Sequence, residues 1–189
     1  MLVTLSTLAF ATTGGPQVLT VLGFEPREHK LFLTSQRFDE GGDLPQLLYY
    51  RLDAPPPEQR PDRPVEVTSY YQSLGDQPFN EFERRIERLK RALQPLEPAP
   101  LRGIEVTLAF GDQKVCNAIP EAPLCEQVAV TVRWAGQQAT TTLTSWGDFE
   151  IAGAWTVPDT DRRLVVLRHV GVTTESGYSA DVPLLLSAP

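Results

Sequence analysis

The strongest candidate for an ion site in the sequence is a short acidic turn built around two glycines. Asp39, Glu40 and Asp43 flank Gly41 and Gly42. Carboxylate oxygens of this kind are hard ligands that suit Ca²⁺. The turn lacks the full ligand spacing of an EF-hand loop, and acidic glycine turns also occur simply for solubility. Calcium binding by Asp39, Glu40 and Asp43 is therefore a hypothesis, with a plain solvated turn as the alternative.

Two cysteines could form a covalent link. Cys116 and Cys125 are the only cysteines of the chain, and the segment between them contains two prolines. Such a segment favours a compact loop, and a disulfide across it would remove about 2–3 kcal/mol of loop entropy from the unfolded state. Because this is useful only in an oxidising compartment, the pair predicts export. The alternative is two reduced thiols in a cytosolic protein. A metal site is disfavoured, since neither histidine lies nearby in sequence.

Aromatic side chains are the third candidate feature. Tyr49, Tyr71 and Trp146 could contribute to a platform that binds a sugar or a peptide. Trp146 stands beside Gly147 and is the member expected at the surface. Core or edge packing is the alternative, and it is the commoner use of aromatic residues on alternating strands.

Signatures of an enzyme are mostly missing. The sequence has no Gly-x-Ser-x-Gly elbow, phosphate loop, dinucleotide fingerprint or His-Glu-x-x-His pair. His29 falls in a proline turn and His169 in an apolar strand pattern, so we expect both to be structural residues. No catalytic residue and no cofactor are predicted. A Ser-His-Asp triad assembled from distant parts of the chain stays open.

Composition limits the class of partner. Hydrophobic residues make up 41% and charged residues 22% of the 189 residues, which is typical of a globular chain rather than a disordered one. The net charge of −7 argues against nucleic acid as a partner, because phosphate binding needs clustered Lys and Arg. It also argues against docking on anionic lipid. No apolar run is long enough to span a membrane.

The elements that must position these residues are mostly strands, because apolar residues alternate along most of the chain. Strands are predicted over residues 17–24, 30–36, 47–52, 64–71, 104–110, 128–134, 139–145, 149–157, 164–170 and 182–186. A glycine at position 136 predicts a tight hairpin. The stretch 54–64 holds five prolines and is expected to be an extended surface connection.

One amphipathic helix interrupts the strands. Its apolar stripe consists of Phe79, Phe82, Ile86, Leu89 and Leu93. Asp76 is the expected cap, and Glu81–Arg85 is an expected ion pair one turn apart. The predicted fold class is therefore mostly β (α+β): antiparallel strand meanders, arranged like a sandwich or as two packed sheets, with one amphipathic helix inserted midway.

We expect one domain over residues 1–189, with two possible β subunits at 12–72 and 101–189 joined by a helix over 78–95. Each half reads as strand, proline turn, strand, glycine turn, strand. An internal duplication is one explanation of this echo. The alternative is that any two hairpins look alike at this level of description.

A family resemblance is carried by several of these segments together. They are Gly23-Phe24-Glu25-Pro26, the acidic glycine turn, Pro45 before a tyrosine-containing strand, the charged helix, and Glu175-Ser176-Gly177. With them the chain resembles a bacterial family of predicted secreted proteins of unknown function, in which a propeller-blade-like strand unit precedes a helix and a second β section. The family's usual Asp-Gly after the proline is Arg27-Glu28 here. The resemblance implies location and fold, and no activity.

The amino terminus also bears on location. Residues 2–10 are apolar, and Ala9-Phe10-Ala11 has the pattern of a signal-peptidase site, although a positive n-region is missing. A first β-strand is the alternative. The sequence thus predicts a periplasmic or secreted protein. Its leading functional interpretation is a non-enzymatic module that binds a protein, peptide or glycan partner in the cell envelope. A hydrolase or inhibitor-like protein with an inconspicuous site, and a purely structural domain, remain as alternatives.

Overall fold

The computed structural model of the chain describes residues 15–38, 44–72, 74–115, 124–171 and 178–188. Strands make up 58% of the structure and helices 11%, so the fold is mostly β, as the alternation predicts. In chain order the elements are β1 (Gln17–Glu25), β2 (Lys30–Arg37), β3 (Gln46–Arg51), β4 (Val65–Glu66), the 3-10 helix η1 (Thr68–Tyr71), α1 (Pro78–Lys90), β5 (Glu97–Pro98), β6 (Ile104–Val115), β7 (Leu124–Trp134), β8 (Gln137–Thr156), β9 (Arg163–Gly171) and β10 (Ser179–Leu186).

All the strands belong to one large mixed sheet, with the order β4-β3-β2-β1-β10-β9-β8-β7-β6 and with β5 paired to β8. Neighbouring strands are antiparallel except for β1 and β10, which run parallel. That parallel pair is registered at Gln17 and Ala180 alone, and the two strands diverge beyond it. The sheet is therefore weakly joined at its centre.

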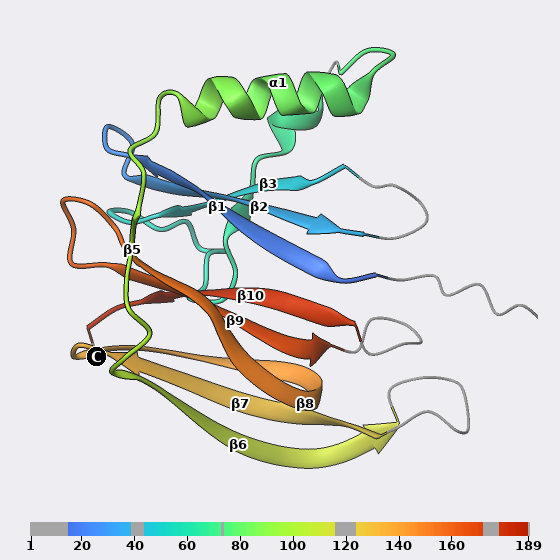
Figure 1. Ribbon diagram of the computed structural model, residues 1–189, viewed down its shortest axis with the longest axis vertical. Helices are drawn as coiled ribbons and strands as arrows, with labels where there is room; N and C mark the ends of the chain where they lie inside the picture. Colours follow the sequence, from blue (N-terminus) through green and yellow to red (C-terminus); the bar gives the residue numbers. More distant parts are fainter. Residues whose placement is uncertain (1–14, 39–43, 73, 116–123, 172–177, 189) are drawn as a thin grey trace, which may run out of the picture.

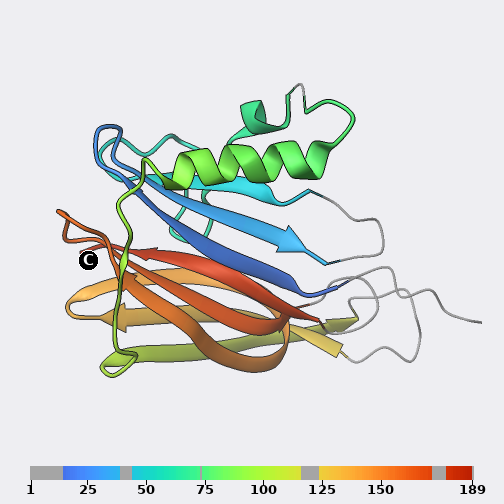
Figure 2. The ribbon, with the colours of Figure 1, turned by 45° about the horizontal axis from the view of Figure 1, so that its top comes forward.

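The sheet folds back on itself, so that its parts form stacked layers (Figures 1 and 2). Helix α1 covers one face of β1–β3, β9 and β10 lie on the other face, and β6, β7 and the first part of β8 lie beyond them. The sheet bends back within β8, where the pairing with β9 shifts register between Ser145 and Phe149 and again between Ile151 and Gly153. Such bulges bend a strand sharply.

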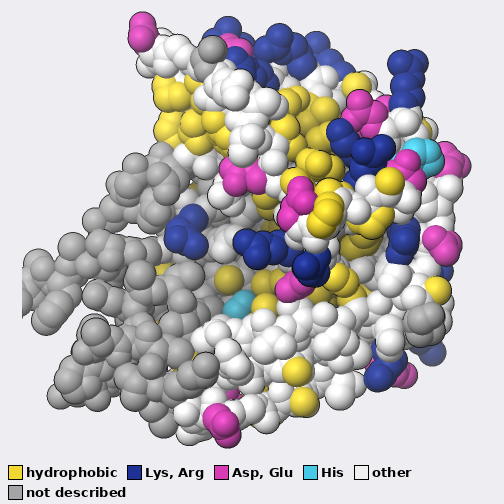
Figure 3. All heavy atoms as spheres, turned by 180° about the vertical axis from the view of Figure 1, so that it is seen from behind, with side chains coloured by type: hydrophobic (Ala, Val, Ile, Leu, Met, Phe, Trp, Pro, Cys, Tyr) yellow, Lys and Arg dark blue, Asp and Glu magenta, His cyan; other side chains and the backbone are white. Residues whose placement is uncertain are grey.

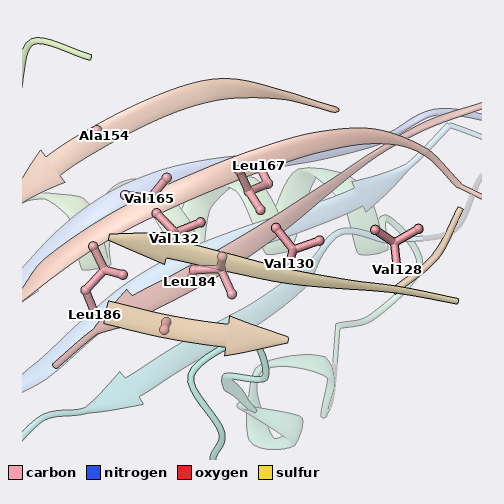
Figure 4. Close-up of a cluster of buried hydrophobic side chains, with 9 residues drawn as sticks. Val128, Val130, Val132, Ala154, Val165, Leu167, Leu184 and Leu186 are labelled. Atoms are coloured by element: carbon pink, nitrogen blue, oxygen red, sulfur yellow. The ribbon is translucent and has the colours of Figure 1, made fainter. Parts of the chain in front are cut away.

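Three clusters of buried apolar side chains fill the spaces between the layers. The cluster between β7 and β9–β10 contains Val128, Val130, Val132, Ala139, Ala154, Val165, Leu167, Leu184 and Leu186 (Figure 4). The cluster between β9–β10 and β1–β3 contains Phe24, Leu31, Leu33, Tyr50, Leu96, Val157, Leu164 and Leu185. The cluster under α1 contains Phe32, Leu47, Leu74, Phe82 and Ile86. Strands β2, β9 and β10 are thus buried on both faces, which explains their unbroken apolar runs.

A short segment, residues 94–99, ties the two halves of the sheet together, and we call it the strap. At one end Gln94 and Phe24 exchange backbone hydrogen bonds of 2.8 Å in each direction. At the other end Glu97–Pro98 pairs with β8, and the N–H of Ala99 donates to the carbonyl of Ala154 at 2.9 Å. The strap therefore closes the end of the molecule opposite the groove described below.

Most of the expected strands are confirmed, and the exceptions have local causes. The expected strand over 64–71 is wrong: two residues pair as β4, and the chain then turns into η1, where Tyr71 and Phe82 stack with ring centroids 5.8 Å apart. The expected strands 139–145 and 149–157 are one strand, β8, because a bulge rather than a turn lies between them. Residues 94–99 were not expected to pair at all.

The expected helix is confirmed as α1, with corrections at both ends: the helix was expected over 78–95, and α1 ends at Lys90. The cap residue is Gln77 instead of Asp76, and its side chain makes no capping hydrogen bond. Glu81 pairs with Arg85 at 3.1 Å, as the spacing predicts. The side chain of Arg85 also donates to the carbonyl of Tyr70 at 3.1 Å, which holds α1 against η1. The division into two β subunits and the internal duplication stay predictions.

Candidate functional site

A groove of about 870 Å³, lined by both polar and apolar side chains, lies among the described residues. It opens where β1 and β10 diverge, and it runs between the first sheet layer and the first part of β8. Its lining is formed by Gln17, Leu19, Ser35, Gln46, Leu48, Glu58, Arg60, Asp62, Arg63, Pro64, Val65, Glu66, Thr142, Leu143, Thr144, His169, Ala180, Asp181, Val182 and Pro183. A smaller pocket of about 360 Å³ adjoins it and shares four of these residues.

A tight hairpin, residues 60–63, reaches into one end of the groove, and we call it the arginine hairpin. The carbonyl of Pro61, at its tip, accepts the N–H of Leu185 in β10 at 2.8 Å. The hydroxyl of Thr141 in β8 donates to the carboxylate of Asp62. The tip thus fills the gap between β10 and β8 at this point. The proline-rich connection is therefore bonded to β10 and β8 while its tip stays exposed, and the sequence did not predict these bonds.

The hydroxyl of Tyr50 bonds to the tip of the arginine hairpin. This buried hydroxyl lies 2.8 Å from the carbonyl oxygen of Pro61 and 3.2 Å from that of Pro183, and it shares its proton between them. Burial, and in second place the negative charge of Asp62, raises the pKa of the Tyr50 hydroxyl well above its ordinary value. Tyr50 therefore stays a hydrogen-bond donor at neutral pH.

Beyond the hairpin, the edge of β8 that faces the groove has no strand partner among the described residues. The backbone N–H and C=O of Gln138 bond to Ser187, and hence point away from β7. Backbone groups alternate in direction along an antiparallel strand. Those of Thr142 and Thr144 therefore also point away from β7, into the groove. They form a short open edge with donors and acceptors at main-chain spacing.

A second open edge lies at the outside of the sheet, on β6. The same alternation, carried across β7, turns the backbone groups of Thr107 toward β7 and those of Val106 and Leu108 outward. No described strand pairs with them. This edge is the outer edge of the sheet and does not line the groove, whereas Thr142 and Thr144 of β8 do.

Basic side chains gather beside the groove. Figure 3 shows a band of Lys and Arg side chains across the middle of the rear face. Arg60 and Arg63 line the groove, and neither forms an ion pair within the described part of the chain. Arg37 lines the adjoining pocket. Arg60 and Arg63 share the lining of the groove with four carboxylate side chains.

An ion pair between the buried Asp181 and the partly exposed Arg168 stabilises the point where β1 and β10 separate. The Nε of Arg168 donates to Asp181 at 2.8 Å, and its Nη2 donates to the second carboxylate oxygen at 3.1 Å. That second oxygen also accepts the backbone N–H of Leu19 at 3.1 Å. The hydrogen bond that Arg168 donates to Asp181 is the main reason why the pKa of Arg168 is raised. Asp181 thus substitutes for a missing strand partner at the mouth of the groove.

A serine and a histidine meet near the groove, but their arrangement is structural. The Nδ1 of His169 lies 3.2 Å from the Oγ of Ser145. Ser145 is 1% exposed, and its hydroxyl lies 2.9 Å from the carbonyl of Val170 and accepts the N–H of Gly147 at 3.1 Å. Its donor and acceptor capacity is used within the β8 bulge. Burial lowers the pKa of His169, whose ring stacks on Phe149.

The aromatic residues predicted to bind a partner are not brought together. Tyr49 and Tyr71 pack in the cluster under α1, and Tyr71 accepts the N–H of Leu47 through its hydroxyl. Trp146 lies in the bulge of β8 and is half-buried, with β2, β1, β10 and β9 between it and β3. Its indole Nε1 is buried and has no partner in the described structure. The three residues do not form a common platform.

The other predicted sites fall partly or wholly outside the described residues. Asp39, Glu40 and Asp43 lie outside them, as do Cys116 and residues 1–11. Cys125 is fully buried at the start of β7. Its pairing with Cys116 stays a prediction. His29 is exposed in the turn after β1. Within the described ranges, no three His, Cys, Asp or Glu side chains are placed to hold a metal ion.

Comparisons with known proteins do not assign the groove. No family model, no curated protein and no solved structure matches the chain. No helix in the described residues has the length and apolarity needed to cross a membrane.

The sequence contained a partial signal for the groove. The run Thr140-Thr141-Thr142 marks the open part of β8, because an edge that faces a polar groove needs polar side chains on alternate positions. The proline-rich stretch around Arg60 and Arg63 gave no indication that its tip enters the fold. That placement depends on backbone contacts between residues more than 100 positions apart.

Proposed function

We propose that this chain is a non-enzymatic binding module that accepts an extended polypeptide segment of a partner protein in the groove. The segment pairs with the open edge of β8 at Thr142 and Thr144, and its side chains contact the arginine hairpin on one side and β10 on the other.

The observation that carries this proposal is the open edge inside a groove. Unpaired N–H and C=O groups at main-chain spacing are a template for another strand. Recognition by strand addition takes its affinity from such main-chain hydrogen bonds and its specificity from side-chain pockets on either side. The arginine hairpin already occupies one end of the same gap, since Pro61 bonds to β10 and Asp62 to β8. A partner segment would occupy the rest of that gap.

Two other functions fit the groove less well. A glycan site needs aromatic faces on which sugar rings stack, and the groove lining named above contains no Trp, Tyr or Phe. A hydrolase needs an accessible nucleophile, whereas the hydroxyl of Ser145 is buried and already bonded to the backbone. The groove offers a ligand main-chain groups, guanidinium groups, carboxylates and aliphatic side chains.

The proposal includes export from the cytoplasm, and it rests there on the sequence. The Cys116–Cys125 pair and Ala9-Phe10-Ala11 support it. Mass spectrometry of the native protein, with and without reductant, tests this part. Loss of the first eleven residues together with a reducible disulfide is expected. Free thiols and an intact Met1 would contradict export.

Strand addition is tested by selection from a random decapeptide display library on the immobilised full-length protein. We expect enriched peptides, and we expect Thr142→Pro to weaken their binding by about fivefold or more, because it removes an N–H from the open edge. Thr142→Val is the matched control, because it keeps the N–H and changes only the side chain. The N–H of Thr142 makes no bond to β7, so neither change breaks the sheet. Equal binding by Thr142→Pro and wild type would refute strand addition.

A further inference from the structure

We infer that Arg60 and Arg63 form a recognition pair for a single acidic residue of the bound segment. This inference rests on the proposed function and adds the chemistry of the partner: a polypeptide whose extended segment carries one aspartate or glutamate at a fixed position.

The geometry of the hairpin places the two side chains together. The N–H of Arg60 donates to the carbonyl of Arg63 at 3.0 Å, and the N–H of Arg63 donates back at 3.0 Å. The two residues are therefore directly opposite each other on adjacent strands. Residues in this relation have Cβ atoms about 4.5–5.5 Å apart, with side chains on the same face. Both side chains line the groove.

This arrangement is unfavourable unless an anion joins it. Like charges directly opposite each other on paired strands destabilise the pair. Neither arginine has a carboxylate partner in the described residues, whereas Arg168 in the same protein is held by two hydrogen bonds to Asp181. Each guanidinium is a planar fork that can bind a carboxylate with two parallel hydrogen bonds, and the hairpin brings two of them to the lining of one groove.

One of the two guanidinium groups is already oriented. The Nη1 of Arg60 donates to the carbonyls of Pro57 and Gln59, the second at 2.9 Å. These bonds use one nitrogen and leave the others for a ligand. A guanidinium fixed by the backbone loses less side-chain entropy on binding than a free one.

The hairpin lies next to the open edge. Asp62 precedes Arg63 and accepts the hydroxyl of Thr141, which precedes Thr142. A segment paired with Thr142 therefore passes beside the two arginines. Glu58 and Glu66 line other parts of the same groove, so an acidic residue at a different position of the segment would be repelled. The charges thus favour a segment with an acidic residue at one position over a segment that is acidic throughout.

The same library selection tests this inference through the composition of the enriched peptides. On wild type we expect Asp or Glu to accumulate at one position. On the double variant Arg60→Gln/Arg63→Gln this preference should disappear while peptides are still enriched. Arg102→Gln is the matched control, because Arg102 is an exposed arginine outside the groove and makes no ion pair in the described structure.

A synthetic peptide with the enriched sequence gives the size of the effect. Replacing its acidic residue by the corresponding amide should weaken binding to wild type by about tenfold, as the loss of charge-assisted hydrogen bonds implies. The same replacement should leave binding to the double variant unchanged. The tenfold difference should shrink when the ionic strength rises from about 0.01 M to about 0.1 M, because the Debye length falls from about 30 Å to about 10 Å.

The outcomes separate the two proposals. Enriched peptides without a positional preference for Asp or Glu would overturn the arginine-pair inference and leave the peptide groove standing. A preference that persists in Arg60→Gln/Arg63→Gln would also overturn it. Failure of any peptide to be enriched would contradict the proposed function itself. A parallel selection uses a library that contains phosphoserine. If it enriches phosphoserine peptides over those with Asp or Glu, the inference of a carboxylate ligand is overturned in favour of a phosphorylated residue.

Discussion

The meander β1–β2–β3 and the meander β8–β9–β10 have the same arrangement of strands, but different elements pack on them. In each, the first strand has a bulge before a glycine, at Gly23 opposite Phe32 and at Gly153 opposite Val166. In each, the strap bonds to the first strand just after that glycine. The first meander is covered by α1, and the second by β6, β7 and the first part of β8.

The difference in cover explains where the groove lies. A helix satisfies all its internal backbone groups, so it can cover a sheet without leaving an open edge. A strand that folds over the sheet cannot, and within the described residues no strand pairs with β8 at Thr142 and Thr144, next to the diverging β10. The two meanders would thus differ in role, with the first serving as support and the second providing the binding edge. The following predictions test the comparison, beginning with the largest effect.

Gly23→Ala should cause the largest loss of stability. Gly23 has φ +149°, and an added Cβ would lie 2.7 Å from the backbone oxygen of Gln94 and 2.8 Å from the Cβ of Leu93. The strap would have to move, and we expect about 2–4 kcal/mol less free energy of unfolding in urea titrations.

Gly153→Ala is the matched control in the second meander. Its added Cβ would meet the ring of Trp155, a half-buried side chain that can shift, and not the backbone. We expect a smaller loss of about 1–2 kcal/mol. Equal losses of stability for the two variants would show that the contact between the strap and Gly23 is no tighter than the contact between Trp155 and Gly153.

Tyr50→Phe should cost about 1–2 kcal/mol, because the carbonyl of Pro61 or that of Pro183 loses its hydroxyl partner. It should also change the alkaline limit of stability. The folded-state pKa of Tyr50 is raised above its ordinary value of 10.0, so its contribution is complete below about pH 10 and is lost as the pH rises further. Urea titrations across this range should show a weaker alkaline loss for Tyr50→Phe. If Tyr50→Phe and wild type lose the same free energy of unfolding at alkaline pH, ionisation of Tyr50 is not the cause of that loss.

His169→Phe should change the acid limit instead. Burial lowers the folded-state pKa of His169 below its ordinary value of 6.5. The unfolded state therefore binds the proton more readily, and stability that is complete above about pH 6.5 is lost as the pH falls below it. We expect the loss between about pH 6.5 and pH 5 to be smaller in His169→Phe than in wild type. An unchanged slope would indicate that burial does not lower the pKa of His169.

The smallest predicted effect is a gain. Arg63→Gln removes a like-charge pair across the arginine hairpin, and the free energy of unfolding should rise by about 0.3 kcal/mol at low salt. Arg102→Gln should leave stability unchanged. A loss of stability in Arg63→Gln would mean that the arginine supports the fold, which would remove the argument from unfavourable charge.

Much of the fold was predictable from local patterns, whereas the groove was not. Apolar alternation and continuous apolar runs located β1, β2, β3, β6, β7, β9 and β10, and the helical stripe located α1. The single strand β8 was read as two, because a bulge at Gly147 resembles a turn in sequence. The positions of Pro61 and Thr141 depend on contacts between distant segments, and residue patterns within one segment carry no information on them.

Amide hydrogen exchange by NMR tests the central proposal most directly. The N–H groups of Thr142 and Thr144 are measured with and without a saturating amount of an enriched peptide, and those of Val106 and Leu108 on the open edge of β6 serve as the internal control. Strand addition in the groove predicts slower exchange at Thr142 and Thr144 and unchanged exchange at Val106 and Leu108. Unchanged exchange at Thr142 and Thr144, or protection at β6 instead, would contradict it.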